Sequence, residues 1–208
     1  MVCKRLLFTF LAILFVGVGC VCAQSGELQQ PVKKATVLAL RSNLLVPGLN
    51  VGAVLPLGNK FSFAADYYYP WFESKKNRHC LQLLGVSAEF RYWFGKQRSY
   101  DRRLRGHSLA VYGSAGYYDL EYNFEGTQGE YVNTGLDYTY ALGLGKKKRV
   151  HLEFTLAVGY IHSEGRPYYV LADYGPLFKE NHDMVFDYVG PTKAAVSIVV
   201  PIFKRRMK

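Results

Sequence analysis

The chain has few cysteines and no helical pattern beyond its first residues. Four of its 208 residues are cysteines, and Cys3, Cys20 and Cys22 all lie within the first 23 residues. If that segment is removed, only Cys80 remains and no internal disulfide can form. No later stretch repeats its apolar residues with a period of 3.6, which argues against a helical bundle or an α/β fold.

Motifs of familiar catalytic and metal-binding chemistry are also missing. The chain contains no CxxC or HExxH spacing, and no glycine-rich phosphate loop or pair of catalytic carboxylates stands out. His79 beside Cys80 comes nearest to a metal or thiol site, but a structural role at a loop-to-strand junction explains the two residues better. We therefore expect no metal, no cofactor and no enzymatic activity.

The N-terminus has the pattern of a secretory signal. Two basic residues at 4–5 precede an apolar run over 6–18, and small residues follow as far as Ala23. This pattern predicts a signal peptide over 1–23 that is cleaved before Gln24, and hence an exported protein.

Two other readings of this segment stay open. A lipoprotein would carry its lipid on Cys20, although Gly17 stands where that motif prefers leucine. An uncleaved membrane anchor is the second alternative. In either case residues 24–34 form a leader before the first strand.

Positive charge is concentrated rather than spread. The formal net charge is +10, and about half of the basic residues fall in three clusters: Lys96, Arg98, Arg102, Arg103 and Arg105; 146–149; and the tail over 204–208. A nucleic-acid site would need these clusters beside exposed stacking aromatics or a known motif. We expect solvated turns or contacts with lipid phosphates, and no nucleic-acid partner.

The dominant pattern in the rest of the chain is alternation. Leu152, Phe154 and Leu156 share one face of a strand, while Glu153 and Thr155 share the other. Eight stretches read in this way: 35–44, 49–56, 61–71, 80–94, 107–122, 131–144, 149–162 and 184–203, the last with a break at Gly190-Pro191. The pattern predicts an all-β fold over 35–203, an eight-stranded antiparallel up-and-down transmembrane β-barrel.

The expected connections divide between two sides. If the chain enters from the periplasm, the connections 57–60, 95–106 and 145–148 lie on that side. The outer side then holds a short loop at 46–48 and the longer loops 73–79, 123–130 and 163–183. Longer outer loops are typical of outer-membrane barrels.

The polar face consists mostly of small residues, with few of the lysines and glutamates that coat soluble proteins. Such a face suits a narrow, crowded barrel interior. Buried charges need partners because desolvation is costly. We therefore predict a charge network in the lumen formed by the face's charged members: Arg41, Asp66, Glu89, Arg91, Asp137, Glu153 and Lys193.

The apolar face fits a lipid environment. Aliphatic residues occupy the middle of the strands, and aromatic residues gather toward the strand ends, where they would form interfacial girdles: Tyr67, Tyr69, Trp71, Tyr92, Phe94, Tyr138 and Tyr160. Periodicity alone leaves open a soluble barrel that buries this face, so a soluble periplasmic ligand-binding barrel remains an alternative.

Several motifs resemble one known family. They are Tyr69-Pro70-Trp71, the run 77–83 (NRHCLQL) and the run 89–95 (EFRYWFG), with shorter matches such as 116–119 (GYYD) and 190–194 (GPTKA). The chain is identified by them as a member of the domain-of-unknown-function family 3575 (DUF3575) of Bacteroidetes, over roughly 42–200. The resemblance implies an outer-membrane-barrel-like fold and genes near fimbrial subunits, and it supplies no catalytic residues. The basic tail departs from an ordinary barrel ending, where a terminal aromatic such as Phe203 is typical.

Together these features predict a non-enzymatic barrel of the outer membrane, in contact with its lipid. Its outward loops would provide structure or contact a fimbrial or other surface-assembly protein. The alternative enzyme is a lipid-modifying hydrolase that uses His162, Ser163 and Glu164. On a strand Ser163 would point away from the other two, so a nucleophile-base contact would require a turn there.

Overall fold

The computed structural model describes residues 35–46, 48–58, 60–74, 79–94, 104–144, 150–171, 175–179 and 183–205. Every regular element within these residues is a β-strand, and none of them forms a helix that could cross a membrane. The predicted signal peptide, its cleavage site and the leader lie outside the described residues, as do most of the basic clusters.

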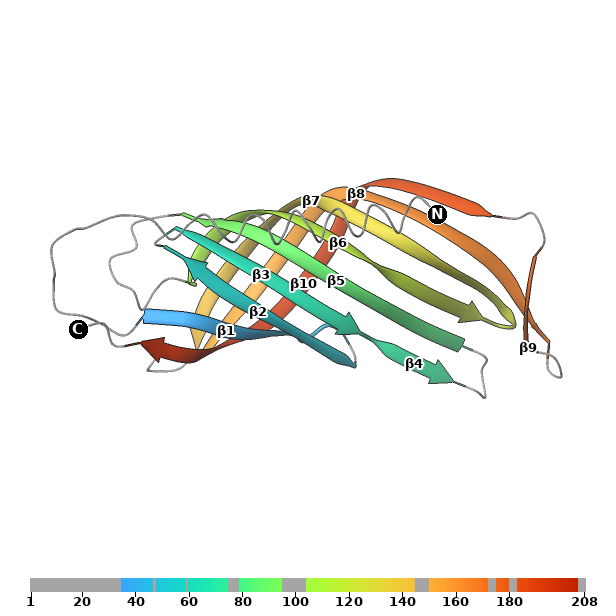
Figure 1. The fold of residues 1–208 in the computed structure, drawn as a ribbon, viewed down its shortest axis with the longest axis horizontal. Helices are drawn as coiled ribbons and strands as arrows, with labels where there is room; N and C mark the ends of the chain where they lie inside the picture. Colours follow the sequence, from blue (N-terminus) through green and yellow to red (C-terminus); the bar gives the residue numbers. More distant parts are fainter. Residues whose placement is uncertain are drawn as a thin grey trace, which may run out of the picture. The chain divides into compact units, whose positions relative to one another are not determined.

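Ten strands form one antiparallel sheet (Figure 1). They are β1 Ala35–Asn43, β2 Leu49–Leu57, β3 Phe61–Tyr69, β4 Trp71–Ser74, β5 His79–Trp93, β6 Gly106–Tyr122, β7 Glu125–Leu144, β8 Val150–Leu171, β9 Gly175–Phe178 and β10 Met184–Arg205. Eight of them follow one another around a ring that closes because β10 pairs with both β8 and β1. The short strands β4 and β9 add to the outer edges of β5 and β8. The predicted all-β, up-and-down ring of eight antiparallel strands is confirmed.

The strands of the ring are staggered. Directly paired residues lead from Ala39 in β1 through each strand in turn and arrive at Gly190 in β10. The partner of Ala39 in β10 is instead Pro201, farther along that strand. A closed sheet with such a stagger has strands that tilt relative to the ring axis.

The two ends of the ring differ. At one end, here called the terminal end, β1 begins and β10 ends, and Ala35 pairs with Arg205. At the opposite, distal end β1, β2 and β3 stop after nine residues each, whereas β6, β7, β8 and β10 have 17 to 22. The long strands therefore continue beyond the short ones. We call this part the distal extension: residues 79–84, 117–122, 125–131, 161–171 and 184–188, with β4 and β9.

Two of the loops expected at the distal end are instead strand. The loop expected at 123–130 is a two-residue turn at Asn123 and Phe124, with φ angles of 50° and 70°. Two positive φ angles are typical of the turn whose twist matches a hairpin. The usual Asn-Gly signal is absent, which is why this expectation was wrong. The loop expected at 163–183 was also wrong in part, because β8 continues to Leu171 and β9 follows.

Proline has different effects at two positions. Pro70 separates β3 from β4, so the single strand expected over 61–71 is two strands. The break expected at Gly190-Pro191 is absent, since β10 runs through with only a register irregularity between Pro191 and Lys193. A bulge of this kind accommodates a residue that cannot donate a backbone hydrogen bond.

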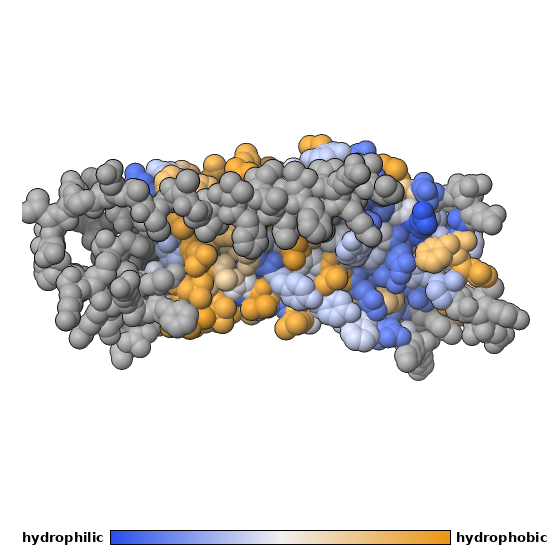
Figure 2. Space-filling model, viewed as in Figure 1, coloured by the Kyte–Doolittle hydropathy of each residue, from blue (hydrophilic) through white to orange (hydrophobic). Residues whose placement is uncertain are grey.

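The two faces of the ring are as the alternation predicted. Leu156 is 67% and Val111 60% exposed on the outer face, while Glu153 and Arg91 are 0% exposed in the lumen. Figure 2 shows hydrophobic residues over the left and middle of the described surface and hydrophilic residues gathered toward the right.

In the distal extension the sense of the alternation reverses. Directly paired residues on neighbouring strands share a face, so each row of pairs can be followed across the sheet. One outer-face row runs Gln82, Asp119, Gln128 and Arg166. The inner-face row beside it runs Leu81, Leu120, Thr127 and Pro167. At the level of Glu89 and Glu153 the inner side chains are charged and the outer rows are apolar, so the exposed apolar residues change from the outer to the inner face along the same strands.

Candidate functional site

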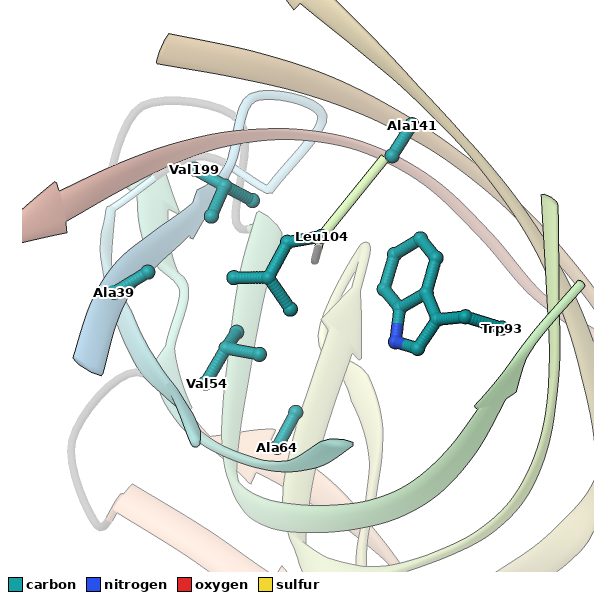
Figure 3. Close-up of a cluster of buried hydrophobic side chains, with 7 residues drawn as sticks. All are labelled: Ala39, Val54, Ala64, Trp93, Leu104, Ala141 and Val199. Carbon is teal, nitrogen blue, oxygen red and sulfur yellow. The ribbon is translucent and has the colours of Figure 1, made fainter. Parts of the chain in front are cut away.

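An apolar plug closes the lumen at the terminal end. Leu104, from the connection between β5 and β6, lies inside the ring, only 1% exposed and close to the lumen-facing residues around it (Figure 3). The indole of Trp93 is equally buried, and its Nε1–H donates to Ser62 Oγ at 2.8 Å. The plug consists of Ala39, Val54, Ala64, Trp93, Leu104, Ala141 and Val199.

A charge network lies next to the plug, and it joins all seven residues that the sequence predicts for the lumen. Arg41 is at its centre. Its guanidinium donates to Asp66, with Nε 2.8 Å from Oδ1, and to both carboxylate oxygens of Glu89 at 3.0 and 3.1 Å. Its Nη1 is 3.7 Å from Glu153 Oε2.

The second half of the network crosses the lumen. Arg91 donates from Nε to Glu89 Oε2 and from Nη1 to Glu153 Oε2, both at 2.8 Å. Lys193 donates to Glu89, and its Nζ is 3.9 Å from Asp137 Oδ2. Glu89 thus receives all three cationic side chains, from β1, β5 and β10.

This arrangement has a physical cause in the small residues around it. Gly52 lies beside the carboxylate of Asp66, and a side chain at residue 52 would occupy the space of that carboxylate. The five innermost members, Arg41, Glu89, Arg91, Asp137 and Glu153, are at most 5% exposed. Ion pairs so poorly hydrated are held by their mutual contacts, and removal of one partner leaves an uncompensated buried charge.

A layer of tyrosines follows the charge network toward the distal end. The hydroxyls of Tyr68 and Tyr131 are hydrogen-bonded to each other, and Tyr112 OH donates to Asn133 Oδ1 at 2.9 Å. The rings lie against glycines: a Cβ at Gly85 would be 2.5 Å from the Tyr68 ring, and one at Gly116 2.9 Å from Tyr131 Cε1. Glycine on the lumen face therefore makes room for an aromatic ring from a neighbouring strand.

Beyond this layer the inner face is apolar and open. Phe186 and Tyr188 belong to the inner rows because they pair directly with Ser163 and Ile161. Even so, Phe186 is 55% exposed, and Leu120 is 44% exposed. A cavity of about 540 Å³ lies here, and its lining is mixed: Leu120, Tyr122, Pro167 and Met184 line it together with Glu121, Glu125 and Lys179.

The residues of the alternative hydrolase are not brought together. Ser163 is buried on the inner face, where its hydroxyl donates to Glu130 O at 3.0 Å and its Oγ is 3.0 Å from Tyr118 OH. His162 is on the outer face, with Nδ1 2.8 Å from Asp187 Oδ1 and Nε2 3.4 Å from Glu164 Oε1. The strand separates the hydroxyl from the imidazole, as the alternation implies.

These carboxylates affect the titration of His162. Hydrogen bonds from the imidazole to the carboxylates of Asp187 and then Glu164 raise the pKa of His162 above its ordinary value. The hydrogen bond from Tyr160, followed by the one from His162, lowers the pKa of Asp187. The result is an exposed pair on the outer face, where the distal extension begins, in which the charged form of the imidazole is stabilised.

No metal centre emerges from the described residues, since no three of their His, Cys, Asp or Glu side chains are grouped to hold an ion. His79 stacks on Tyr122 with ring centroids 4.5 Å apart, and His79 and Cys80 pair in β5 with both β4 and β6. Both residues therefore lie at the start of a strand, in the structural position expected of them.

Some lumen residues were not foreseen from the sequence. Tyr68, Tyr112 and Tyr131 point inward although the aromatic residues as a class were assigned to the outer face. The available signal is the glycine that each ring covers, since Gly85, Gly159 and Gly116 lie on the polar face of neighbouring strands. Leu104 had no signal, because it belongs to a connection rather than to a strand.

The fold and lumen can now be compared with known proteins. No curated protein and no solved structure matches the chain. A family model, described as a protein of unknown function (DUF3575), matches residues 10–202, nearly the whole of the chain. The chain therefore belongs to the DUF3575 family, as its motifs indicated.

Proposed function

We propose that the protein is a non-enzymatic integral β-barrel of an outer membrane, with a structural or surface-assembly role. The observation that carries the proposal is the contrast between the two faces of the ring. The outer face presents a continuous apolar surface, and the lumen holds seven charged side chains in mutual contact. A soluble barrel would have the opposite arrangement, because apolar surface favours burial.

The reversal of the faces supports a water boundary at a definite level. In β8 the outer residues from Leu152 to Tyr160 are apolar or aromatic, and those that follow are His162, Glu164 and Arg166. A span of nine residues matches the length that a tilted strand needs to cross the apolar layer of a membrane. The tyrosine at the end of the span is suited to the interface.

Closure of the ring supports the same proposal. In a membrane every backbone N–H and C=O must be paired within the protein, and a closed ring meets this need without an edge. Along β1, from Ala35 to Asn43, the ring is closed, because β1 pairs with β2 on one side and with residues 197–205 of β10 on the other. A flat sheet would leave two unpaired edges in lipid.

The filled lumen favours structure or assembly over transport. The apolar plug and the charge network occupy successive levels of the lumen. Most of their side chains are almost completely buried, so they fill the lumen at these levels. Free diffusion through such an interior is not expected. We infer that the distal extension is the working part of the protein and faces outward, where a fimbrial or other surface-assembly protein would contact it.

Fractionation of cells tests this proposal. The protein should stay with the outer membrane after osmotic shock and require detergent for extraction. In gel electrophoresis the unheated sample should migrate faster than the heated one, because a closed barrel stays compact in detergent. Release into the periplasmic fraction by osmotic shock would contradict the membrane assignment. If the protein stays with the outer membrane, crosslinking on whole cells identifies the surface protein that it contacts.

A further inference from the structure

The ring has a gap at its distal end. Residues 184–195 of β10 pair with β8, but β1 reaches only as far as Ser197, with a last hydrogen bond from Leu44 N–H to Val196 O. Among the described residues no strand pairs with the free side of 184–195. On the other side of the gap β4 pairs only with β5. The β1–β2 hairpin borders the gap on the side of the terminal end.

That border is apolar. The connection between β1 and β2 begins Leu44-Leu45, and both side chains are 59% exposed. Leu49, the first residue of β2, is also exposed on the outer face. A short hairpin with such a tip fits lipid rather than water, so the gap opens at the edge of the apolar outer surface.

The surface behind the gap is apolar as well. The inner face of the distal extension carries Leu81, Leu120, Met184 and Phe186, all substantially exposed, while one outer-face row of β5 to β8 carries charged and amide side chains. Exposed apolar side chains on this inner face would gain nothing if the face were in contact with water alone. Along the gap, residues 189–195 of β10 pair with 155–160 of β8, the part of β8 whose outer face is apolar.

The floor of this space is closed. The tyrosine layer and the charge network lie between it and the terminal end, and Lys193 and Asp66 are the network members that keep some exposure. A molecule that enters from the distal side therefore reaches a blind compartment. This geometry is that of a binding site and not of a channel.

We propose that the inner face of the distal extension binds an acyl chain of a membrane lipid, which enters sideways through the gap above the β1–β2 hairpin. The inference rests on the proposed outer-membrane location. The chain contacts Leu81, Leu120 and Phe186, and the lipid headgroup stays at the polar level marked by His162 and Asp187. Apolar side chains that would otherwise meet water supply the stabilisation.

Photo-crosslinking with a lipid that carries a diazirine in its acyl chain tests the proposal. Purified protein is reconstituted into vesicles that contain this lipid, irradiated, and mapped by mass spectrometry. Labels are expected on the outer surface of the ring near Leu156 and also on the inner face near Leu120 and Phe186. In Phe186→Asp the inner labels should be lost and the outer labels kept.

Val185→Asp is the matched control, because Val185 is the neighbouring residue of β10 on the opposite face of the sheet. It should keep both sets of labels. Labels confined to the outer surface in the wild-type protein would overturn the inference and leave the membrane barrel intact. Absence of labels near Leu156 would instead overturn the proposed function.

A second probe distinguishes the source of the chain. A soluble photoactivatable amphiphile is added to protein in vesicles without the lipid probe. Entry from the membrane predicts that the lipid probe labels the inner face more strongly than the soluble amphiphile does. The reverse result, or inner labelling that survives Phe186→Asp, would contradict sideways entry of a lipid chain into this site.

Discussion

The part of the ring between the terminal end and the distal extension, here called the lower ring, and the distal extension use the same strands in opposite ways. Along β8 the outer face runs from Phe154 and Leu156 to Glu164 and Arg166, while the inner face changes from Glu153 to Ile161 and Pro167. Every strand has two faces on which successive side chains alternate. Which of the two is apolar depends on the environment that each face contacts. The difference shows that alternation alone locates strands, whereas the point at which its sense reverses marks the level at which the proposed membrane would end.

Loss of a central charge should affect the lower ring most. In Glu89→Gln one carboxylate that accepts from Arg41, Arg91 and Lys193 is lost, and the buried cations lose their shared partner. We expect the free energy of unfolding to fall by about 3–5 kcal/mol. Urea titration of the reconstituted protein, followed by the heat-dependent shift in gel migration, measures it.

Phe90→Leu is the control, since Phe90 is the next residue of β5 on the outer face. It should change the free energy of unfolding by no more than about 1 kcal/mol. Equal losses in the two variants would show that the lumen charges have no special part in stability.

Overpacking the tyrosine layer should have the second largest effect. In Gly85→Val the new side chain meets the rings of Tyr68 and Tyr131, whose nearest atoms are 2.5 and 2.6 Å from an added Cβ. A loss of about 1–3 kcal/mol is expected from the same urea titration. Ala88→Val on the outer face of β5 should be tolerated. A similar loss of stability in that variant would show that a larger side chain destabilises β5 in general, and that contact with the tyrosine side chains is not the cause.

The two regions also differ in how well the sequence predicts them. In the lower ring the seven charged residues could be chosen from the sequence because they share a face with small residues and nearly balance in sign. In the distal extension the run 125–130 was read as a loop, since its glycines resemble turn residues. They are instead strand positions covered by rings, with Tyr168 over Gly126 and Tyr118 beside Gly129. A packing role of this kind depends on cross-strand register, which a single sequence does not reveal.

The network has one more carboxylate than it has cations, so loss of a weakly paired carboxylate should have a much smaller effect than loss of Glu89. Four carboxylates face three cations, and among the described residues the contacts of Asp137 are weak, a distant ion pair with Lys193 and a hydrogen bond from Thr139 at 3.5 Å. Asp137→Asn should therefore change the free energy of unfolding by less than about 1 kcal/mol. A loss as large as that of Glu89→Gln would mean that the network acts as one unit in which every member counts equally.

The smallest effect is expected at the boundary between the two regions. The pKa of His162 is raised in the folded protein by Asp187 and Glu164. The charged pair is therefore fully formed below the ordinary pKa of histidine, about 6.5, and its contribution is lost as pH rises through the raised value. Asp187→Asn should lower the His162 pKa, as followed by NMR of the imidazole protons, and an unchanged titration would show that the carboxylate does not reach the ring in solution.

The most direct test of the whole account is the environment of the outer face of β8. In a Cys80→Ser background, single nitroxide labels are placed at each residue from 152 to 166 of the reconstituted protein. Labels at 152, 154, 156, 158 and 160 should be accessible to oxygen and shielded from a water-soluble nickel reagent, and those at 164 and 166 should show the reverse. If the label at Leu156 is instead reached freely by the nickel reagent, the apolar face meets water and the membrane-barrel account is wrong.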